Sequence, residues 1–120
     1  MTLDELPDLA HLSAEHLDGL PYGVIQLDAT GKILAFNRTE GEMAYISAYK
    51  AIGRNFFTEI APCTDVKEFR GRFDSFLKST KQSERFYFTY KLPHRTIEVE
   101  LLFVRVGQSL AFLVSKKMES

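Results

Sequence analysis

Strand-like segments occur at both ends of this chain and helical segments lie between them, and this order restricts the possible folds more than any other feature. Near the start, residues 22–28 and 32–37 flank the turn residues 29–31 and predict a hairpin. The last third contains three further segments rich in aromatic and β-branched residues, at 84–91, 96–106 and 109–115. Two N-terminal and three C-terminal strands can join in one antiparallel sheet, with the helices covering one face.

The middle of the chain predicts several short helices followed by a longer one. Residues 38–52 are rich in Glu, Met and Ala, which suits short irregular helices, and Gly53 ends them. One longer helix is predicted from Val66 to Ser79, where apolar residues recur at helical spacing: Phe69, Phe73, Phe76 and Leu77. This order of elements is the layout of a PAS domain, an α+β fold with a five-stranded antiparallel sheet flanked by short helices.

Residues 1–20 form a separate N-terminal segment, which we expect to dock on the rest of the chain as a helical cap. Its leucines recur near helical spacing, and Ser13 is a candidate helix N-cap. These apolar residues are too few for an independently stable helix, so the cap must borrow burial from the domain of residues 21–120.

Composition excludes several classes of function. The 120 residues carry a formal net charge of -1 with mixed signs, which argues against a nucleic-acid-binding surface. A single cysteine excludes an internal disulfide and any zinc site built from several cysteines, and the histidines suggest no metal site. No apolar run approaches membrane-spanning length and the N-terminus lacks the features of a signal peptide. We therefore expect a cytoplasmic protein, a monomer or weak dimer, with no membrane partner.

The single cysteine, Cys63, lies in the most distinctive stretch of the chain, residues 55–65. Pro62 directly precedes it, biases Ala61 away from helical geometry and ends any helix that runs through residues 55–60. Cys63 is therefore predicted to begin a loop or a short new helix beside an apolar wall. From the residues alone, it could be a buried small hydrophobe or a thiol whose pKa is tuned by its surroundings.

From Leu17 onward the sequence resembles the photoactive yellow protein family. The most specific blocks are Asn55-Phe56-Phe57 and Ala61-Pro62-Cys63-Thr64-Asp65, with Glu40-Gly41 upstream at the family's spacing. The register is free of gaps from Leu17 to about Leu101, and a small deletion near Gly107 then follows.

The resemblance implies a PAS-fold blue-light receptor that is not an enzyme. It implies that p-coumaric acid (4-hydroxycinnamic acid) is attached to Cys63 as a thioester, and that a buried, protonated Glu40 hydrogen-bonds its phenolate. Light then isomerises the chromophore, Glu40 donates its proton, and the partly unfolded protein signals to a downstream partner that is not identified by the sequence. From the residues alone, by contrast, Glu40 beside Glu42 is typical of a solvated helical face.

The resemblance further implies a chromophore pocket, whose predicted members besides Cys63 and Glu40 are Ile25, Phe36, Ala44, Ile46, Phe56, Ala61, Pro62, Thr64, Phe88, Tyr90 and His94.

Several of these positions depart from the family's usual residues. Phe36 replaces the tyrosine that shares the phenolate with the glutamic acid, Ala44 replaces the threonine that supports that tyrosine, and Ile46 replaces an arginine. A tyrosine and a phenylalanine two places apart are exchanged, as Phe88 and Tyr90, and His94 replaces a methionine associated with fast dark recovery. Three tyrosines are candidates for a replacement hydroxyl: Tyr45, Tyr87 and Tyr90.

Two other functions remain open at this point. A PAS domain that has lost its chromophore would serve as an interaction or dimerisation module, and the departures above favour it. A thiol redox sensor would need an exposed Cys63 of lowered pKa, and the apolar flanking residues argue against that exposure.

Overall fold

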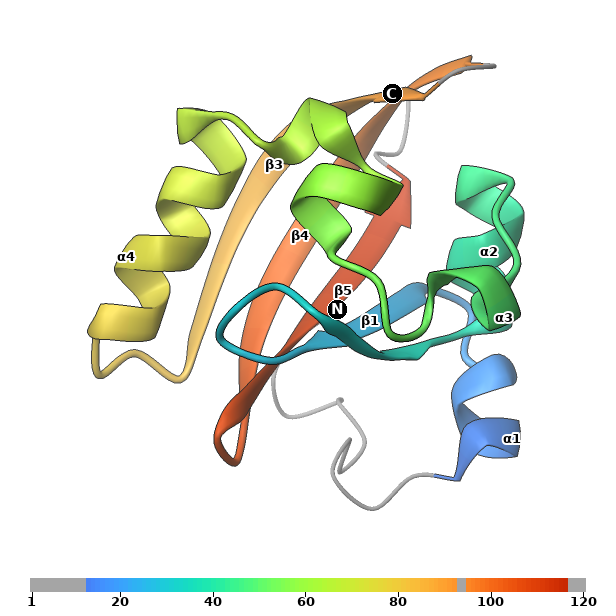
Figure 1. Ribbon diagram of the computed structural model, residues 1–120, viewed down its shortest axis with the longest axis horizontal. Helices are drawn as coiled ribbons and strands as arrows, with labels where there is room; N and C mark the ends of the chain where they lie inside the picture. The colour runs from blue at the N-terminus through green and yellow to red at the C-terminus, as the bar shows by residue number, and fades with distance from the viewer. Residues whose placement is uncertain (1–12, 93–94, 117–120) are drawn as a thin grey trace.

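The computed structural model describes residues 13–92 and 95–116 and shows a five-stranded antiparallel sheet with helices packed on it (Figure 1). Strands from the two ends of the chain join in this one sheet, as the sequence predicted; the strand order is β2-β1-β5-β4-β3, and the two groups meet at the β1–β5 pair. The strands are β1 (Gly23–Leu27), β2 (Ile33–Phe36), β3 (Ser83–Leu92), β4 (Arg95–Val106) and β5 (Ser109–Lys116).

Among the described residues, six short helical elements lie between β2 and β3, and one, α1, precedes β1. They are α1 (Ala14–Asp18), α2 (Arg38–Ala44), α3 (Ala48–Ala51), the π-helix η3 (Phe56–Ile60), the 3-10 helix η4 (Pro62–Thr64), the π-helix η5 (Lys67–Gly71) and α4 (Arg72–Lys78). The single helix predicted from Val66 to Ser79 is therefore a π turn that continues as an α-helix. The Val66 carbonyl accepts from the amides of Arg70 at 2.8 Å and Gly71 at 3.4 Å, which widens the first turn.

Aromatic packing attaches the helical segments to the sheet. The ring of Phe69, fully buried in η5, contacts six other rings at centroid separations of 5.0–6.1 Å: Phe56, Phe57, Phe86, Phe88, Phe103 and Phe112. Most of these contacts are edge-to-face, an arrangement that favours a defined geometry over a fluid one. The core thereby fixes η3 to η5, the stretch that contains Cys63, against β3, β4 and β5.

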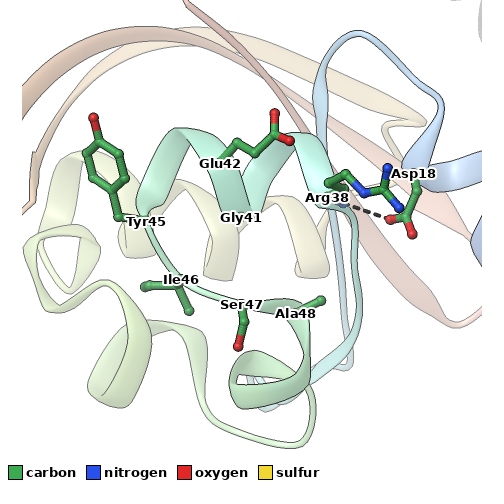
Figure 2. A pocket seen from close by; sticks show the side chains of 8 residues that line it. All are labelled: Asp18, Arg38, Gly41, Glu42, Tyr45, Ile46, Ser47 and Ala48. Atoms are coloured by element: carbon green, nitrogen blue, oxygen red, sulfur yellow. Dashed lines mark hydrogen bonds between the residues drawn. The ribbon is translucent and has the colours of Figure 1, made fainter.

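Hydrogen bonds rather than burial attach α1 to the domain. Ser13 caps this helix as predicted, because its hydroxyl accepts from the His16 amide at 3.2 Å, but α1 has no buried residue. The Asp18 carboxylate accepts from the Arg38 amide at 2.8 Å (Figure 2), and the Thr39 hydroxyl donates to the Leu20 carbonyl at 2.6 Å. The described part of the N-terminal segment is thus joined to the first turn of α2.

The rest of the predicted cap, residues 1–12, lies outside the described residues, and the division of the chain at residue 20 stays a prediction. Among residues 13–92 and 95–116, no helix has both the length and the apolar character needed to cross a membrane.

Candidate functional site

Asn37 positions the helix that carries Glu40. It is 1% exposed and caps α2, with Oδ1 accepting from the amides of Glu40 at 3.1 Å and Val24 at 2.8 Å. Its Nδ2 donates to the carbonyls of Leu17 at 2.8 Å and Tyr22 at 3.0 Å. One buried amide therefore ties α2 to β1 and to the N-terminal segment.

Glu40 is buried and has no hydrogen-bond partner for one carboxyl oxygen. The residue is 1% exposed, and its Oε2 has no partner in the structure. This oxygen lies against the backbone of Gly23, where a β-carbon would overlap it, so the glycine leaves room for the carboxyl group. Burial raises the pKa of Glu40 to about 8, so the side chain is mainly neutral near pH 7. The solvated position expected from the residues alone is therefore wrong.

Cys63 lies in η4, which is a short new helix rather than the loop that the sequence left as the alternative, and which begins one residue earlier than predicted. Pro62 occupies its first turn, where the missing amide proton costs no helical hydrogen bond. The buried Thr64 hydroxyl donates to the Ala61 carbonyl at 2.6 Å and closes the turn. Cys63 is a free, partly buried thiol that packs against the aromatic core.

A small, mainly apolar cavity separates α2 from η3 and the end of β3. Its volume is only about 10 Å³, and it is lined by Phe36, Glu40, Ala44, Ile46, Phe56, Ile60, Ala61, Tyr90 and Leu92. Seven of these nine were predicted as site residues. Ile60 and Leu92 were not, although Ile60 lies one helical turn after Phe56 and Leu92 lies two strand positions after Tyr90.

Some predicted site residues do not line this cavity. Ile25 is fully buried in β1 opposite Phe36, Thr64 is buried in η4, Pro62 is exposed, and Phe88 packs against Phe69. Cys63 is also not a lining residue, although Ala61, two positions before it, is. His94 lies outside the described residues.

Tyr90 is the second buried polar residue of the cavity. It is 1% exposed and its hydroxyl has no hydrogen-bond partner. Burial, followed by the charges of Glu40 and Cys63, raises its pKa well above the ordinary value, so it stays protonated. Tyr90 therefore lies within electrostatic reach of both the carboxyl group and the thiol.

A contact between a tyrosine and an arginine joins two segments that flank the cavity. Arg95 Nη1 donates to the Tyr45 hydroxyl at 3.0 Å, and the guanidinium carbon lies 5.4 Å from the centre of the Tyr45 ring. Tyr45 precedes the lining residue Ile46, and Arg95 pairs with the lining residue Leu92 in the sheet. Arg95 thus holds the start of β4 against the end of α2.

A second, open pocket lies along α2 and the α2–α3 connection and is also lined by Asp18, Arg38 and Ala48 (Figure 2). It contains no unpartnered buried polar atom. Within the described ranges, no group of three or more His, Cys, Asp or Glu residues could hold a metal ion.

Comparison with known proteins identifies the fold and the family of this site. The PAS fold family matches residues 14–110. Photoactive yellow protein of Rhodothalassium salexigens is 37% identical over 110 residues, 90% of this chain and 88% of the relative, and that of Halochromatium salexigens is 34% identical with the same coverage. The chain belongs to the photoactive yellow protein family.

A solved structure agrees with this assignment. The photoactive yellow protein domain of the sensor histidine kinase Ppr from Rhodospirillum centenum superimposes with a TM-score of 0.83 at 34% identity, covering 88% of this chain and 94% of that domain. The PAS domain of an HTR-like protein from Haloarcula marismortui, at 17% identity and a TM-score of 0.70, shares the fold alone. The predicted PAS fold and family are confirmed, and membership of the photoactive yellow protein family supports a PAS-type photoreceptor.

Proposed function

We propose that this protein is a blue-light receptor that carries p-coumaric acid as a thioester on Cys63, with Glu40 as hydrogen-bond and proton donor to the phenolate. The observation that carries the proposal is the buried carboxyl group of Glu40, with Oε2 unpartnered, in a mainly apolar cavity that is also lined by Ala61, two positions before the only cysteine. Such a group is rare in a folded protein unless a ligand uses it.

The chemistry of the lining residues suits this chromophore, and the cavity has to widen to admit its ring. A phenolate buried among Phe36, Ile46 and Phe56 would be costly without hydrogen-bond donors. A protonated Glu40 can donate one such bond, and aromatic and aliphatic side chains supply the surface for the ring. When bound, p-coumaric acid supplies a visible absorption band and a double bond that light can isomerise.

The chain's own residues explain how absorption of light becomes a structural change. Burial keeps the proton on the carboxyl group of Glu40 in the dark, and the phenolate of a bound chromophore would be the group to which Glu40 could pass it. The remaining carboxylate is an unpaired buried charge, which destabilises the packing around α2. Asn37, Arg38 and Thr39 bond α2 to the N-terminal segment. We therefore expect that segment to become less firmly held when the packing of α2 is destabilised.

Reconstitution tests the proposed function. The expressed protein is incubated with an activated ester or anhydride of p-coumaric acid, and absorbance and intact mass are recorded. We expect a yellow product whose mass increases by one coumaroyl group, located at Cys63 by peptide mapping. A colourless protein of unchanged mass would instead favour the chromophore-free interaction module or the redox sensor.

Substitution of Cys63 by Ala or Ser is expected to abolish the pigment completely and leave a folded domain. Cys63 is the only thiol, and a serine hydroxyl is a far weaker nucleophile at neutral pH. Absorbance after reconstitution measures the loss, and thermal unfolding of the apoprotein checks the fold. Yellow colour in both variants would contradict attachment at Cys63.

Steady blue light is expected to speed amide hydrogen exchange in residues 14–20 of the pigmented protein. This segment has no buried side chain in α1 and depends on bonds to α2, so it belongs to the least stable part of the fold. Amides of the central strand β5 serve as the internal control and should change much less. Equal exchange of residues 14–20 in darkness and light would exclude this route.

We further propose that the output is read by a downstream signalling protein. The photoactive yellow protein domain of Rhodospirillum centenum belongs to a sensor histidine kinase, which supports a signalling role for this kind of domain.

A further inference from the structure

We propose that Tyr90, from β3, supplies the second hydrogen bond to the phenolate of the chromophore and so replaces the hydroxyl that position 36 lacks. This inference rests on the proposed function, because it assigns a role to Tyr90 in the same site.

Two unpartnered polar atoms share one cavity. Glu40 Oε2 and the Tyr90 hydroxyl are buried without a hydrogen-bond partner, so they are not bonded to each other either. Buried hydroxyl and carboxyl groups nearly always have partners in native proteins. A charged ligand oxygen that accepts from both groups would satisfy them, and the phenolate oxygen of p-coumaric acid is such an acceptor.

No other described side chain competes for this role. Apart from Glu40 and Tyr90, every side chain that lines the cavity is apolar, and Phe36 contributes a ring without a hydroxyl. Of the other two candidate tyrosines, Tyr45 is 59% exposed and Tyr87 is 62% exposed. Tyr87 lies three positions from Tyr90 on the same strand and therefore on the other face of the sheet.

Tyr90 is also suited to hold a fixed donor. It lies in the longest strand pair, opposite Ile97 of β4, and its ring packs edge-on against Phe88 at 6.2 Å. Its raised pKa keeps the proton on the tyrosine when a negative charge is nearby. The sheet therefore holds the Tyr90 hydroxyl in place, whereas a donor at position 36 would lie at the end of β2.

The test is Tyr90→Phe in reconstituted protein, followed by a pH titration of the dark absorbance. Loss of one hydrogen bond to a charged oxygen should raise the proton affinity of the phenolate about ten- to a hundredfold. The protonated, shorter-wavelength form should therefore persist to higher pH than in the wild type. The anionic band should move to longer wavelength, because fewer hydrogen bonds hold its charge on the phenol oxygen.

Two variants are matched controls. Tyr87→Phe removes the same hydroxyl from an exposed position of the same strand and should change neither the titration midpoint nor the band. Phe36→Tyr, combined with Tyr90→Phe, offers a donor from the other side of the cavity and should move both back toward the wild type. A Tyr90→Phe pigment that is identical to the wild type would overturn the role of Tyr90 while leaving the proposed function intact. A wild type that never becomes yellow would overturn both.

Two further measurements do not require the Tyr90→Phe variant to bind the chromophore. In the apoprotein, Tyr90→Phe should not lower the unfolding temperature, since the hydroxyl has no protein partner to lose; a clear decrease would contradict the proposal. In the wild-type pigment, tyrosine is labelled with 13C at the hydroxyl-bearing ring carbon and observed by NMR. One tyrosine resonance should shift when the chromophore is attached. Absence of any shifted tyrosine would also overturn it.

Discussion

Glu40→Gln is expected to remove most of the pH dependence of apoprotein stability between about pH 4.5 and about pH 8. Burial raises the pKa of Glu40 from its ordinary 4.5 to about 8 in the folded state. In this window the native protein holds a proton that the unfolded chain has released, so the free energy of unfolding falls as pH rises. The stability is fully present below about pH 4.5 and is lost as pH passes through about 8.

The difference between these two pKa values corresponds to an upper limit of about 5 kcal/mol in the free energy of unfolding. Glutamine does not titrate, so its curve should be nearly flat where the wild-type curve falls. Denaturant unfolding at several pH values measures both slopes. All other ionisable groups are the same in both proteins, so their contributions cancel in the comparison.

Glu42→Gln is the matched control for this experiment. It removes a carboxyl group from the same helix at an exposed position, so its pH profile should follow that of the wild type. Wild type and Glu40→Gln profiles with the same slope would show that Glu40 is ionised in the folded protein near pH 7, and would contradict its role as a proton donor.

Asn37→Ala is expected to destabilise the protein by about 3 kcal/mol, a large effect for a single polar side chain. The substitution removes the cap of α2 and leaves the buried amides of Val24 and Glu40 without their side-chain acceptor. It also removes the donor to the carbonyls of Leu17 and Tyr22, so these bonds between the cap of α2 and the residues before β1 are lost as well.

Ser47→Ala is the control for the loss of a helix cap alone. Ser47 caps α3 at an exposed position with a longer bond of 3.4 Å to the Lys50 amide, so its removal should cost about 0.5–1 kcal/mol. Denaturant unfolding compares the two variants. Equal losses would mean that the buried bonds of Asn37 contribute no more than an ordinary cap.

The sheet could be predicted because each strand carries its own local pattern. The β-branched and aromatic segments at the two ends of the chain have to bury one face, and pairing β1 with β5 is what joins them. The π turns at Phe56–Ile60 and Lys67–Gly71 could not be predicted, since their apolar spacing is compatible with ordinary helix.

The polar residues of the site were less accessible to sequence reasoning. The burial of Glu40 depends on the absence of a side chain at Gly23, seventeen positions away on another element, and no local pattern reports that contact. Among the candidate tyrosines, Tyr45 is excluded by its exposure, and the choice of Tyr90 over Tyr87 depends on which face of β3 is buried. Phe86, Phe88 and Tyr90 share one face of that strand. Once that face is known to be buried, their alternation predicts that Tyr90 is buried as well.

The most direct test of the account is a light-minus-dark infrared difference spectrum of the reconstituted wild type, with Glu40→Gln as the reference. The carbonyl band of a protonated carboxylic acid is expected to disappear under blue light and to return in the dark, and Glu40→Gln should lack this signal. A pigment that changes colour under light while no carboxylic acid band is lost, or a band that persists in Glu40→Gln, would contradict Glu40 as the proton donor of this receptor.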